Sequence, residues 1–261
     1  MGGERIDLRG VLPETVLGRA KSEINQLAVR VDGRKVGLGQ VCRVRLAGRM
    51  EDELLLLGDT SCLDHTGWNM QNGRLIVKGN SGWGAGDGMR GGVLEVRGNA
   101  GDCLGKDMQG GTIHVTGCAG DWCGAAEASE KRGMTGGTIL VDGDAGRGVG
   151  AGMRSGLIWV GGHAGDFCAW RMLAGTVICR EGAGKFAGTG MKRGSMVTSR
   201  LEDVPLGFRA AGKADPGWLH LYLRALEGMG ISMPYEWMDL SLSRYTGDHL
   251  EMGKGEIIII P

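Results

Sequence analysis

One motif returns at a nearly fixed interval through the middle of the chain and limits what the chain can fold into. A methionine is followed three residues later by a glycine and then by a short apolar run, and successive methionines lie 19 residues apart except once, where the interval is 26. Self-similarity at such a period is typical of solenoids, in which each repeat stacks on its neighbours. The methionines are Met70, Met89, Met108, Met134, Met153, Met172 and Met191, and the glycines are Gly73, Gly92, Gly111, Gly137, Gly156, Gly175 and Gly194.

The apolar run after each glycine alternates between constant and variable positions. The second and fourth residues after the glycine are aliphatic in most repeats, as Leu75 and Val77 are in the first full repeat. A period of two indicates a strand with one buried face. We therefore expect a mainly β fold, a single-stranded parallel β-helix of about seven 19-residue coils. The methionines are expected to fill a further inward column, because a flexible thioether packs well in irregular space.

A turn of the form G-x-x-G-x-x-x-G follows most of the strands, as at Gly79, Gly82 and Gly86. The residue after the first glycine is often a type that tolerates positive φ, so we predict a left-handed bend there. The next residue is small, which predicts a narrow inward column. The positions after the first glycine are Asn80, Asn99, Cys118, Asp144, His163 and Gly182, and the small residues are Ser81, Ala100, Ala119, Ala145, Ala164 and Ala183.

The repeat divides the chain into three parts. Residues 1–50 do not follow it and are expected to form a small mixed cap, with a half-buried strand over 41–46. Residues 51–200 are the glycine-repeat β-helix, and residues 201–261 form an extension with a helix and a strand. Both ends of a stack of strands expose unpaired edges, so the flanking parts are expected to cover them.

The extension begins with a predicted helix. Asp215 is a good N-cap before Pro216, and apolar residues follow at helical spacing from Trp218 to Met229. This stripe needs an apolar surface, and the outward strand positions become apolar in the later coils, so we expect the helix to pack there. A final strand is expected over 256–260. The apolar outward positions are Leu140, Trp159, Ile178 and Val197.

Composition excludes several classes of protein. The chain carries 30 basic and 30 acidic residues, which gives no indication of nucleic-acid or membrane binding. The start of the chain has no apolar segment of signal-peptide length, and no apolar run approaches a membrane span. Seven cysteines without paired spacing indicate reduced thiols. We therefore expect a cytoplasmic protein.

The residue types of catalytic sites are present but not in catalytic patterns. The histidines are scattered, and neither H-E-x-x-H nor C-x-x-C occurs. The sequence therefore predicts no catalytic residue, no metal ligand and no cofactor bound by this chain. Four cysteines are expected to be small buried hydrophobes, namely Cys103, Cys118, Cys123 and Cys179.

Two kinds of surface remain as candidates for binding. Lys78 and Arg97 share an outward column on adjacent coils, with Arg90 at the neighbouring edge, so they could hold an anionic carrier or could simply be solvated. The seven extra residues of the longer interval lie within 125–132, a segment that could contact a partner or be a tolerated surface loop. The predicted partner interface consists of Leu140, Trp159, Ile178, Glu130, Lys131 and Arg132.

Several segments together resemble a known family. They are the 19-residue coils, Glu130-Lys131-Arg132-Gly133-Met134, the tail Tyr245-Thr246-Gly247-Asp248 with Gly253-Lys254-Gly255-Glu256-Ile257, and the entry segment Gly18-Arg19-Ala20-Lys21-Ser22-Glu23-Ile24. The chain resembles the C subunit of formylmethanofuran dehydrogenases, which also occurs in the bacterial formyltransferase/hydrolase complex. The C-terminal glycine-repeat domain of glutamate synthase is a more distant relative.

The resemblance implies a right-handed β-helix and a function in one-carbon metabolism. Such a complex moves a formyl group between tetrahydromethanopterin and formate through a methanofuran-type carrier. The resemblance implies amidohydrolase-like, formyltransferase and dehydrogenase-like sister subunits, with the metal on a sister subunit. It implies that this chain is a non-catalytic scaffold that could line the path of an anionic, polyglutamate-bearing carrier.

Three alternatives stay open. The complex could be the archaeal molybdenum or tungsten dehydrogenase, although the arginine-rich composition favours the bacterial hydrolase. The chain could be a stand-alone acyltransferase of the hexapeptide-repeat type, which needs a period near 18 and a histidine base between coils. A calcium-binding β-roll needs an aspartate in every turn, and Arg147 and Lys185 interrupt that column.

Overall fold

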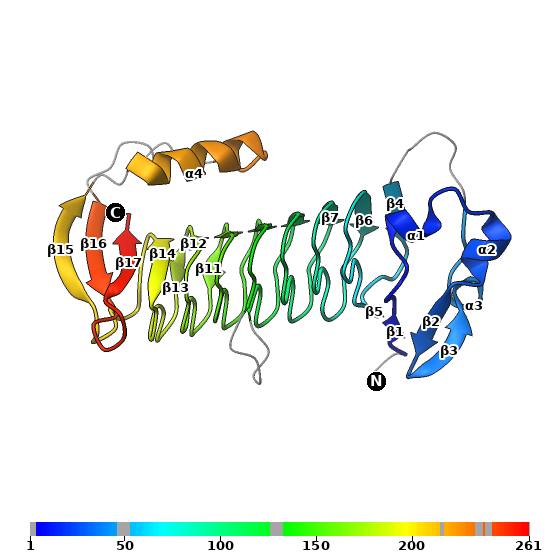
Figure 1. Ribbon diagram of the computed structural model, residues 1–261, viewed down its shortest axis with the longest axis horizontal. Helices are drawn as coiled ribbons and strands as arrows, with labels where there is room; N and C mark the ends of the chain where they lie inside the picture. Colours follow the sequence, from blue (N-terminus) through cyan, green and yellow to red (C-terminus); the bar gives the residue numbers. More distant parts are fainter. Residues whose placement is uncertain are drawn as a thin grey trace.

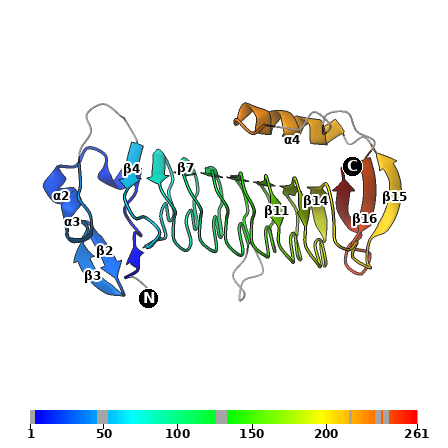
Figure 2. The same ribbon diagram turned by 180° about the vertical axis from the view of Figure 1, so that it is seen from behind.

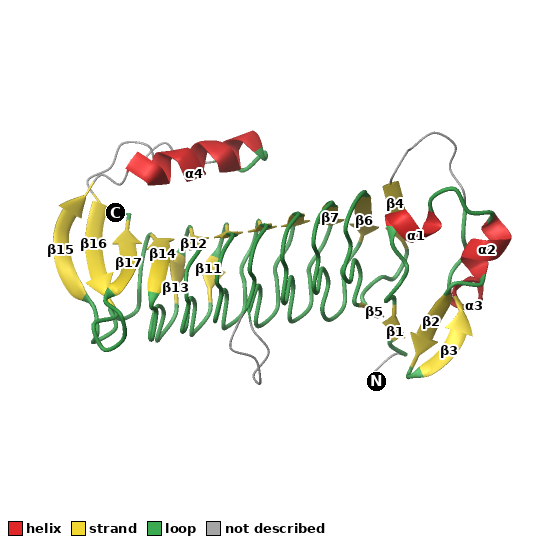
Figure 3. Ribbon diagram, in the orientation of Figure 1, coloured by secondary structure: helices red, strands yellow, loops and turns green. Residues whose placement is uncertain are grey.

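A computed structural model describes residues 4–45, 53–125, 133–214, 217–232, 237 and 242–260. The chain forms an elongated stack of coils with a small mixed segment at one end and a helix lying along one side (Figures 1 and 2). Strands and turns make up most of it, and helices are few (Figure 3). The prediction of a mainly β fold is confirmed. Among the described residues, no helix is long and apolar enough to cross a membrane.

A sheet of 11 strands runs the length of the stack. Within the repeat, neighbouring strands are parallel and keep one register, with Leu75 opposite Leu94 and Leu94 opposite Ile113. Ile113 lies opposite Ile139 across the long interval, so the extra residues leave the register intact. The strands are β4 (Glu53–Leu57), β6 (Arg74–Lys78), β7 (Val93–Val96), β8 (Thr112–Val115), β9 (Thr138–Val141), β10 (Leu157–Val160), β12 (Thr176–Cys179) and β14 (Arg193–Thr198).

The interior of the coils is apolar and filled. All seven repeat methionines are fully buried, and so are the apolar side chains two positions after each repeat glycine. The glycine is required by the backbone: Gly92 has φ +76°, and a Cβ there would lie 2.7 Å from the carbonyl oxygen of Gly73 in the preceding coil. The predicted inward columns of aliphatic residues and methionines are confirmed.

The predicted left-handed bend is found at Gly182, with φ +142°, but in the other repeats it lies elsewhere in the turn. Asn80, Asn99 and Asp144 are not among the residues with positive φ. Their Oδ1 atoms instead accept backbone N–H bonds from the next coil, at 2.8 Å for Asn80 to Asn99 and 2.8 Å for Asp144 to His163. Side-chain capping, not backbone conformation, explains these residues. The left-handed positions come later in the turn and include Cys103, Trp122, Phe167, Ala169, Arg171 and Phe186.

A second ladder of parallel contacts runs along the small-residue column. It consists of β11 (His163–Ala164) paired with β13 (Gly182–Ala183), and of isolated bridges such as that between Ser81 and Ala100. All six predicted small residues are buried. Small side chains let the backbones of successive coils approach at this corner, as predicted.

The N-terminal segment is a small sheet with three short helices. The sheet has the order β3-β2-β1-β5. The strand predicted over 41–46 is absent from residues 41–45. Residue 41 ends a short helix, and the Cys42 N–H donates to the carbonyl oxygen of Leu38 at 2.9 Å. Residues 42–45 pair with no strand. Residue 46 lies outside the described residues. The elements are β1 (Ile6–Asp7), α1 (Pro13–Val16), α2 (Lys21–Asn25), β2 (Ala28–Val31), β3 (Arg34–Gly37), α3 (Leu38–Val41) and β5 (Leu63–Asp64).

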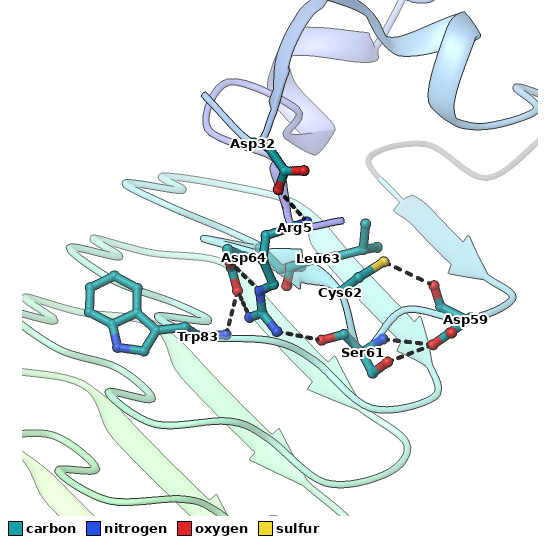
Figure 4. Close-up of polar contacts among 9 residues, drawn as sticks. Arg5, Asp32, Asp59, Ser61, Cys62, Leu63, Asp64 and Trp83 are labelled. Carbon is teal, nitrogen blue, oxygen red and sulfur yellow. Dashed lines mark hydrogen bonds and ion pairs between the residues drawn. The ribbon is translucent and has the colours of Figure 1, made fainter. Parts of the chain in front are cut away.

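Arg5 joins this segment to the first coil (Figure 4). Its guanidinium forms a two-point ion pair with Asp64, with Nε 2.9 Å from Oδ2. Asp64 Oδ1 also accepts the backbone N–H of Trp83 at 2.7 Å. The Arg5 backbone N–H donates to Asp32 at 3.0 Å. One carboxylate therefore caps a turn of the stack and anchors the N-terminal segment.

The C-terminal part supplies the last layer of the stack and a cover for one face. Strand β17 (Lys254–Ile259) pairs in parallel with β14, and β16 (Leu242–Gly247) and β15 (Arg209–Ala214) continue the sheet antiparallel. The predicted final strand is confirmed. Helix α4 (Gly217–Gly228) confirms the predicted helix, while its expected cap, Asp215 and Pro216, lies outside the described residues.

Candidate functional site

The predicted cation ladder is only partly assembled. Lys78 and Arg97 lie side by side at the ends of β6 and β7, with the Arg97 N–H 2.8 Å from the carbonyl oxygen of Val77. Arg90 precedes β7 whereas Arg97 follows it, so a whole strand separates them along the coil. Arg97 Nε also bonds Glu95 Oε1 at 2.6 Å. Among the described residues, Lys78 and Arg90 are exposed without an ion pair.

The part of the sheet face around this ladder is a network of paired charges. Glu95 accepts hydrogen bonds from Arg97 and Arg74, and the Arg97 guanidinium, followed by that of Arg74, holds the pKa of Glu95 below its usual value despite partial burial. On the next coils, His114 Nε2 lies 3.0 Å from Asp142 Oδ1. Arg74 and Arg97 both pair with the one carboxylate of Glu95, which weakens their attraction for an external anion.

The three apolar residues of the predicted partner interface are not on an open surface. Leu140, Trp159 and Ile178 are buried in one cluster with Leu219 and Leu223 of α4. The predicted packing of the helix over this face is confirmed, and these side chains therefore contact the chain itself. Any partner on this side meets the outer surface of α4. The other predicted interface residues, Glu130, Lys131 and Arg132, lie outside the described residues.

The cysteine thiols inside the coils are shielded from solvent. Cys168 Sγ and Cys179 Sγ lie 3.7 Å apart inside the coils. This hydrogen bond and burial raise the pKa of Cys179, and burial raises the pKa of Cys123 to about 12. Because the thiolate is the reactive form, these residues are poor nucleophiles. The prediction of buried cysteines is wrong for Cys118, which is exposed, and for Cys103, which is half-buried at the turn.

His65 lies close to a carboxylate and an aromatic ring. His65 Nδ1 lies 3.4 Å from Asp87 Oδ2, and the His65 ring meets Trp83 edge to face with centroids 4.9 Å apart. Within the described ranges, no group of three histidine, cysteine, aspartate or glutamate residues could hold a metal ion.

An open depression of about 370 Å³ lies on the N-terminal segment between α2 and α3. Its lining contains no carboxylate and no histidine. Partial burial raises the pKa of the Cys42 thiol at its wall, although the residue as a whole is exposed. The lining residues are Lys21, Asn25, Gly39, Gln40, Val41, Cys42, Arg43 and Val44.

Aromatic side chains gather along one corner of the later coils, and the sequence did not indicate this surface. Phe167 and Phe186 stack with ring centroids 5.2 Å apart and planes at 17°, and Phe167 meets Trp170 edge to face at 6.3 Å. Phe186, at the end of the row, is 54% exposed. A column of apolar residues usually indicates burial, but here the column lies at a turn. We define the aromatic ridge as Trp122, Phe167, Trp170 and Phe186.

Two arginines lie on this ridge. The Arg147 guanidinium is 5.8 Å from the ring centroid of Trp122, and that of Arg171 is 4.9 Å from the ring of Trp170. Both geometries are within the range of cation–π attraction. Arg147 Nε also bonds Asp121 Oδ2 at 3.0 Å. The ridge therefore combines flat apolar surface with oriented positive charge.

The fold and these surfaces define a class of protein. It is a β protein built from stacked coils, with a packed apolar interior and with its charged and aromatic candidate binding residues on the outside. No family model matches the chain. Among curated proteins, the Fhc C subunit of the formyltransferase/hydrolase complex of Methylorubrum extorquens is 34% identical over 79 residues, which are 30% of this chain and only 29% of that protein.

The structural similarity extends over the whole chain. It is to a chain of the crystal structure of the formyltransferase/hydrolase complex FhcABCD from Methylorubrum extorquens in complex with methylofuran, with a TM-score of 0.91 and 34% identity. The match covers 100% of this chain and 97% of that one. The chain belongs to the family of the Fhc C subunits, as its sequence motifs predicted.

Proposed function

We propose that this chain is a non-catalytic scaffold subunit of a cytoplasmic formyltransferase/hydrolase complex. The complex would act between formyl-tetrahydromethanopterin, a formylated methanofuran-type carrier and formate. The full-length similarity to a chain of the FhcABCD complex, at 34% identity, carries this proposal. That relative was crystallised with methylofuran, which supports a carrier of this chemical class.

The packed interior supports a scaffold and not an enzyme. The coils are filled by buried aliphatic and methionine side chains, and the pKa values of the Cys123 and Cys179 thiols are raised. We infer that the catalytic metal and the formyl-transferring groups belong to amidohydrolase-like, formyltransferase and dehydrogenase-like sister subunits.

The architecture fits this function. We assign the coils to a right-handed parallel β-helix over residues 51–200, flanked by an N-terminal cap over 1–50 and by the extension over 201–261. A stiff rod with covered ends offers long side faces on which sister subunits can bind at fixed separations. We assign the outer side of α4 and the segment 130–132 to such contacts.

An anionic carrier would meet the uncovered sheet face at Lys78, which is exposed and, like Arg90, makes no ion pair within the described residues. Arg97 is ion-paired with Glu95, so its guanidinium would have to contact Glu95 and the carrier at the same time. Arg90 would contact a different part of an extended carrier.

The hydrolase complex is favoured over a molybdenum or tungsten dehydrogenase because the relative belongs to a formyltransferase/hydrolase complex. A stand-alone acyltransferase is the weaker alternative, since His163 alone occupies a turn column.

Co-purification from the native source with metal analysis tests the proposal. We expect a tagged chain to bring down three sister subunits, with zinc and without molybdenum or tungsten. Recovery of the chain alone would contradict the scaffold function. Recovery with iron and either heavy metal would identify the dehydrogenase instead.

A further inference from the structure

Three of the four residues of the aromatic ridge occupy backbone positions that suit glycine better. Trp122, Phe167 and Phe186 have φ of 65°, 61° and 59°, in the left-handed region that bulky residues rarely adopt. The same turn position in two other coils is Gly84, with φ 68°, and Gly148, with φ 75°. The fold therefore accepts glycine here, and the aromatic side chains are not needed to make the turn.

Arg171, at another position of the turn, is also in the left-handed region where other coils have glycine. Its φ is 52°, whereas the equivalent residues of the adjacent coils are Gly152 and Gly190, with φ 66° and 73°. Side chains held in a disfavoured backbone conformation are found most often at functional sites. Here such residues lie on one corner of the later coils, with Gly148 in the coil between Trp122 and Phe167.

This corner carries three cations. Arg147, Arg171 and Lys185 lie on it beside the carboxylates of Asp121 and Asp166. Both carboxylates also accept backbone N–H groups of the next coil, at 3.1 Å and 2.9 Å. Arg171 and Lys185 make no ion pair within the described part of the chain and are exposed.

We propose that the aromatic ridge, with Arg147, Arg171 and Lys185, is a docking surface for an acidic surface segment of a sister subunit. Tryptophan and arginine are enriched among the residues that contribute most to protein–protein binding, and aromatic residues are enriched at interface cores. The unpaired cations select an acidic partner by charge complementarity. This inference rests on the proposed function, because the partner is another subunit of the same complex.

A competition experiment tests the aromatic part. The wild-type chain is co-expressed with a Phe186→Gly or a Trp122→Gly variant and with limiting amounts of the three sister subunits. The two competing chains carry tags of different mass. We expect the variant to be at least about tenfold under-represented in the purified complex, while its melting temperature as an isolated chain is unchanged or raised because the backbone strain is relieved. The matched control is Leu17→Ala, an exposed apolar residue in the N-terminal segment, which should compete equally.

Charge reversal tests the electrostatic part. Arg171→Glu combined with Lys185→Glu should reduce incorporation about tenfold or more at low salt and less at high salt. Arg34→Glu with Lys35→Glu, on the distant β2–β3 hairpin, is the control and should have no effect. Equal incorporation of the ridge variants and wild type would overturn the inference. So would a parallel loss of melting temperature and incorporation in the glycine variants.

A photo-crosslinking residue at position 186 identifies the partner. We expect a crosslink to an acidic segment of a sister subunit, and a crosslink only to a second copy of this chain would overturn the inference. If wild-type chain assembles but the ridge variants assemble equally well, this inference alone fails. If wild-type chain does not assemble with the sister subunits, the proposed function fails and the inference with it.

Discussion

The indole rings of Trp159 and Trp237 meet edge to face, with centroids 5.9 Å apart and planes at 71°. Trp159 projects from β10, and Trp237 follows α4 in the chain. Both are buried in the cluster that joins the helix to the sheet face. This contact fixes the C-terminal extension on the stack, because it links a strand of the repeat to a segment well outside it.

Removal of this contact should loosen the extension. Trp159→Ala deletes a large buried side chain and should lower the free energy of unfolding by about 3–5 kcal/mol, measured by urea denaturation. Limited proteolysis should then cut next to α4 first. Leu221→Ala, at a position on α4 that is 69% exposed, is the control, with an expected change within about 0.5 kcal/mol. Equal effects of the two changes would contradict the packing described for α4.

A charge placed inside the coils should prevent folding. Val115→Asp puts a carboxylate among fully buried side chains with no cation to pair with it, so we expect insoluble protein on expression. Thr116→Asp, one residue further and exposed, should remain soluble. A soluble, folded Val115→Asp variant would show that the inward assignment is wrong.

The charge network on the sheet face should make stability depend on pH. Hydrogen bonds from Arg97 and then Arg74 hold the pKa of Glu95 below its usual 4.5. Glu95 therefore contributes stability above pH 4.5, and this contribution is lost as the pH falls through the lower pKa of the folded state. Glu95→Gln should lower the urea midpoint at neutral pH, and the difference from wild type should vanish well below pH 4.5. Glu227→Gln, at an exposed position on α4, is the control and should leave the urea midpoint at neutral pH unchanged.

The cysteines should divide into two classes in alkylation experiments. Cys118 is exposed and should react with iodoacetamide in the folded chain. Cys123, Cys168 and Cys179 are buried, and the raised pKa of Cys123 and Cys179 leaves little thiolate, so they should react only after unfolding. Mass spectrometry of peptides from native and denatured protein measures this, and rapid modification of Cys179 in the native chain would contradict the packed interior.

The stacking of the coils was predictable because a fixed period places equivalent residues in the same layer position. Leu75, Leu94 and Ile113 are opposite one another for this reason. The pairing of β17 with β14 was not predictable, since the pattern of Glu256 to Ile260 indicates a strand but not its neighbour. The helix could be matched to Trp159 only because both surfaces were conspicuously apolar.

Two errors in the turns have a physical origin. Asparagine and aspartate favour both left-handed conformation and side-chain capping, and in Asn99 and Asp144 capping prevails. The aromatic ridge was missed because an apolar column suggests burial, whereas the turn directs Phe186 outward. Left-handed aromatic residues such as Trp122 are unfavourable by about 1–2 kcal/mol each, and this signal is visible only once φ is known.

Reconstitution of the complex with and without this chain tests its scaffold function most directly. Turnover of the formylated carrier would be measured for the isolated chain, for the three sister subunits together, and for all four proteins. We expect no turnover by the isolated chain, and an intact four-subunit assembly with full turnover only when the chain is present. Turnover by the isolated chain, or a fully active assembly that forms without it, would contradict this account.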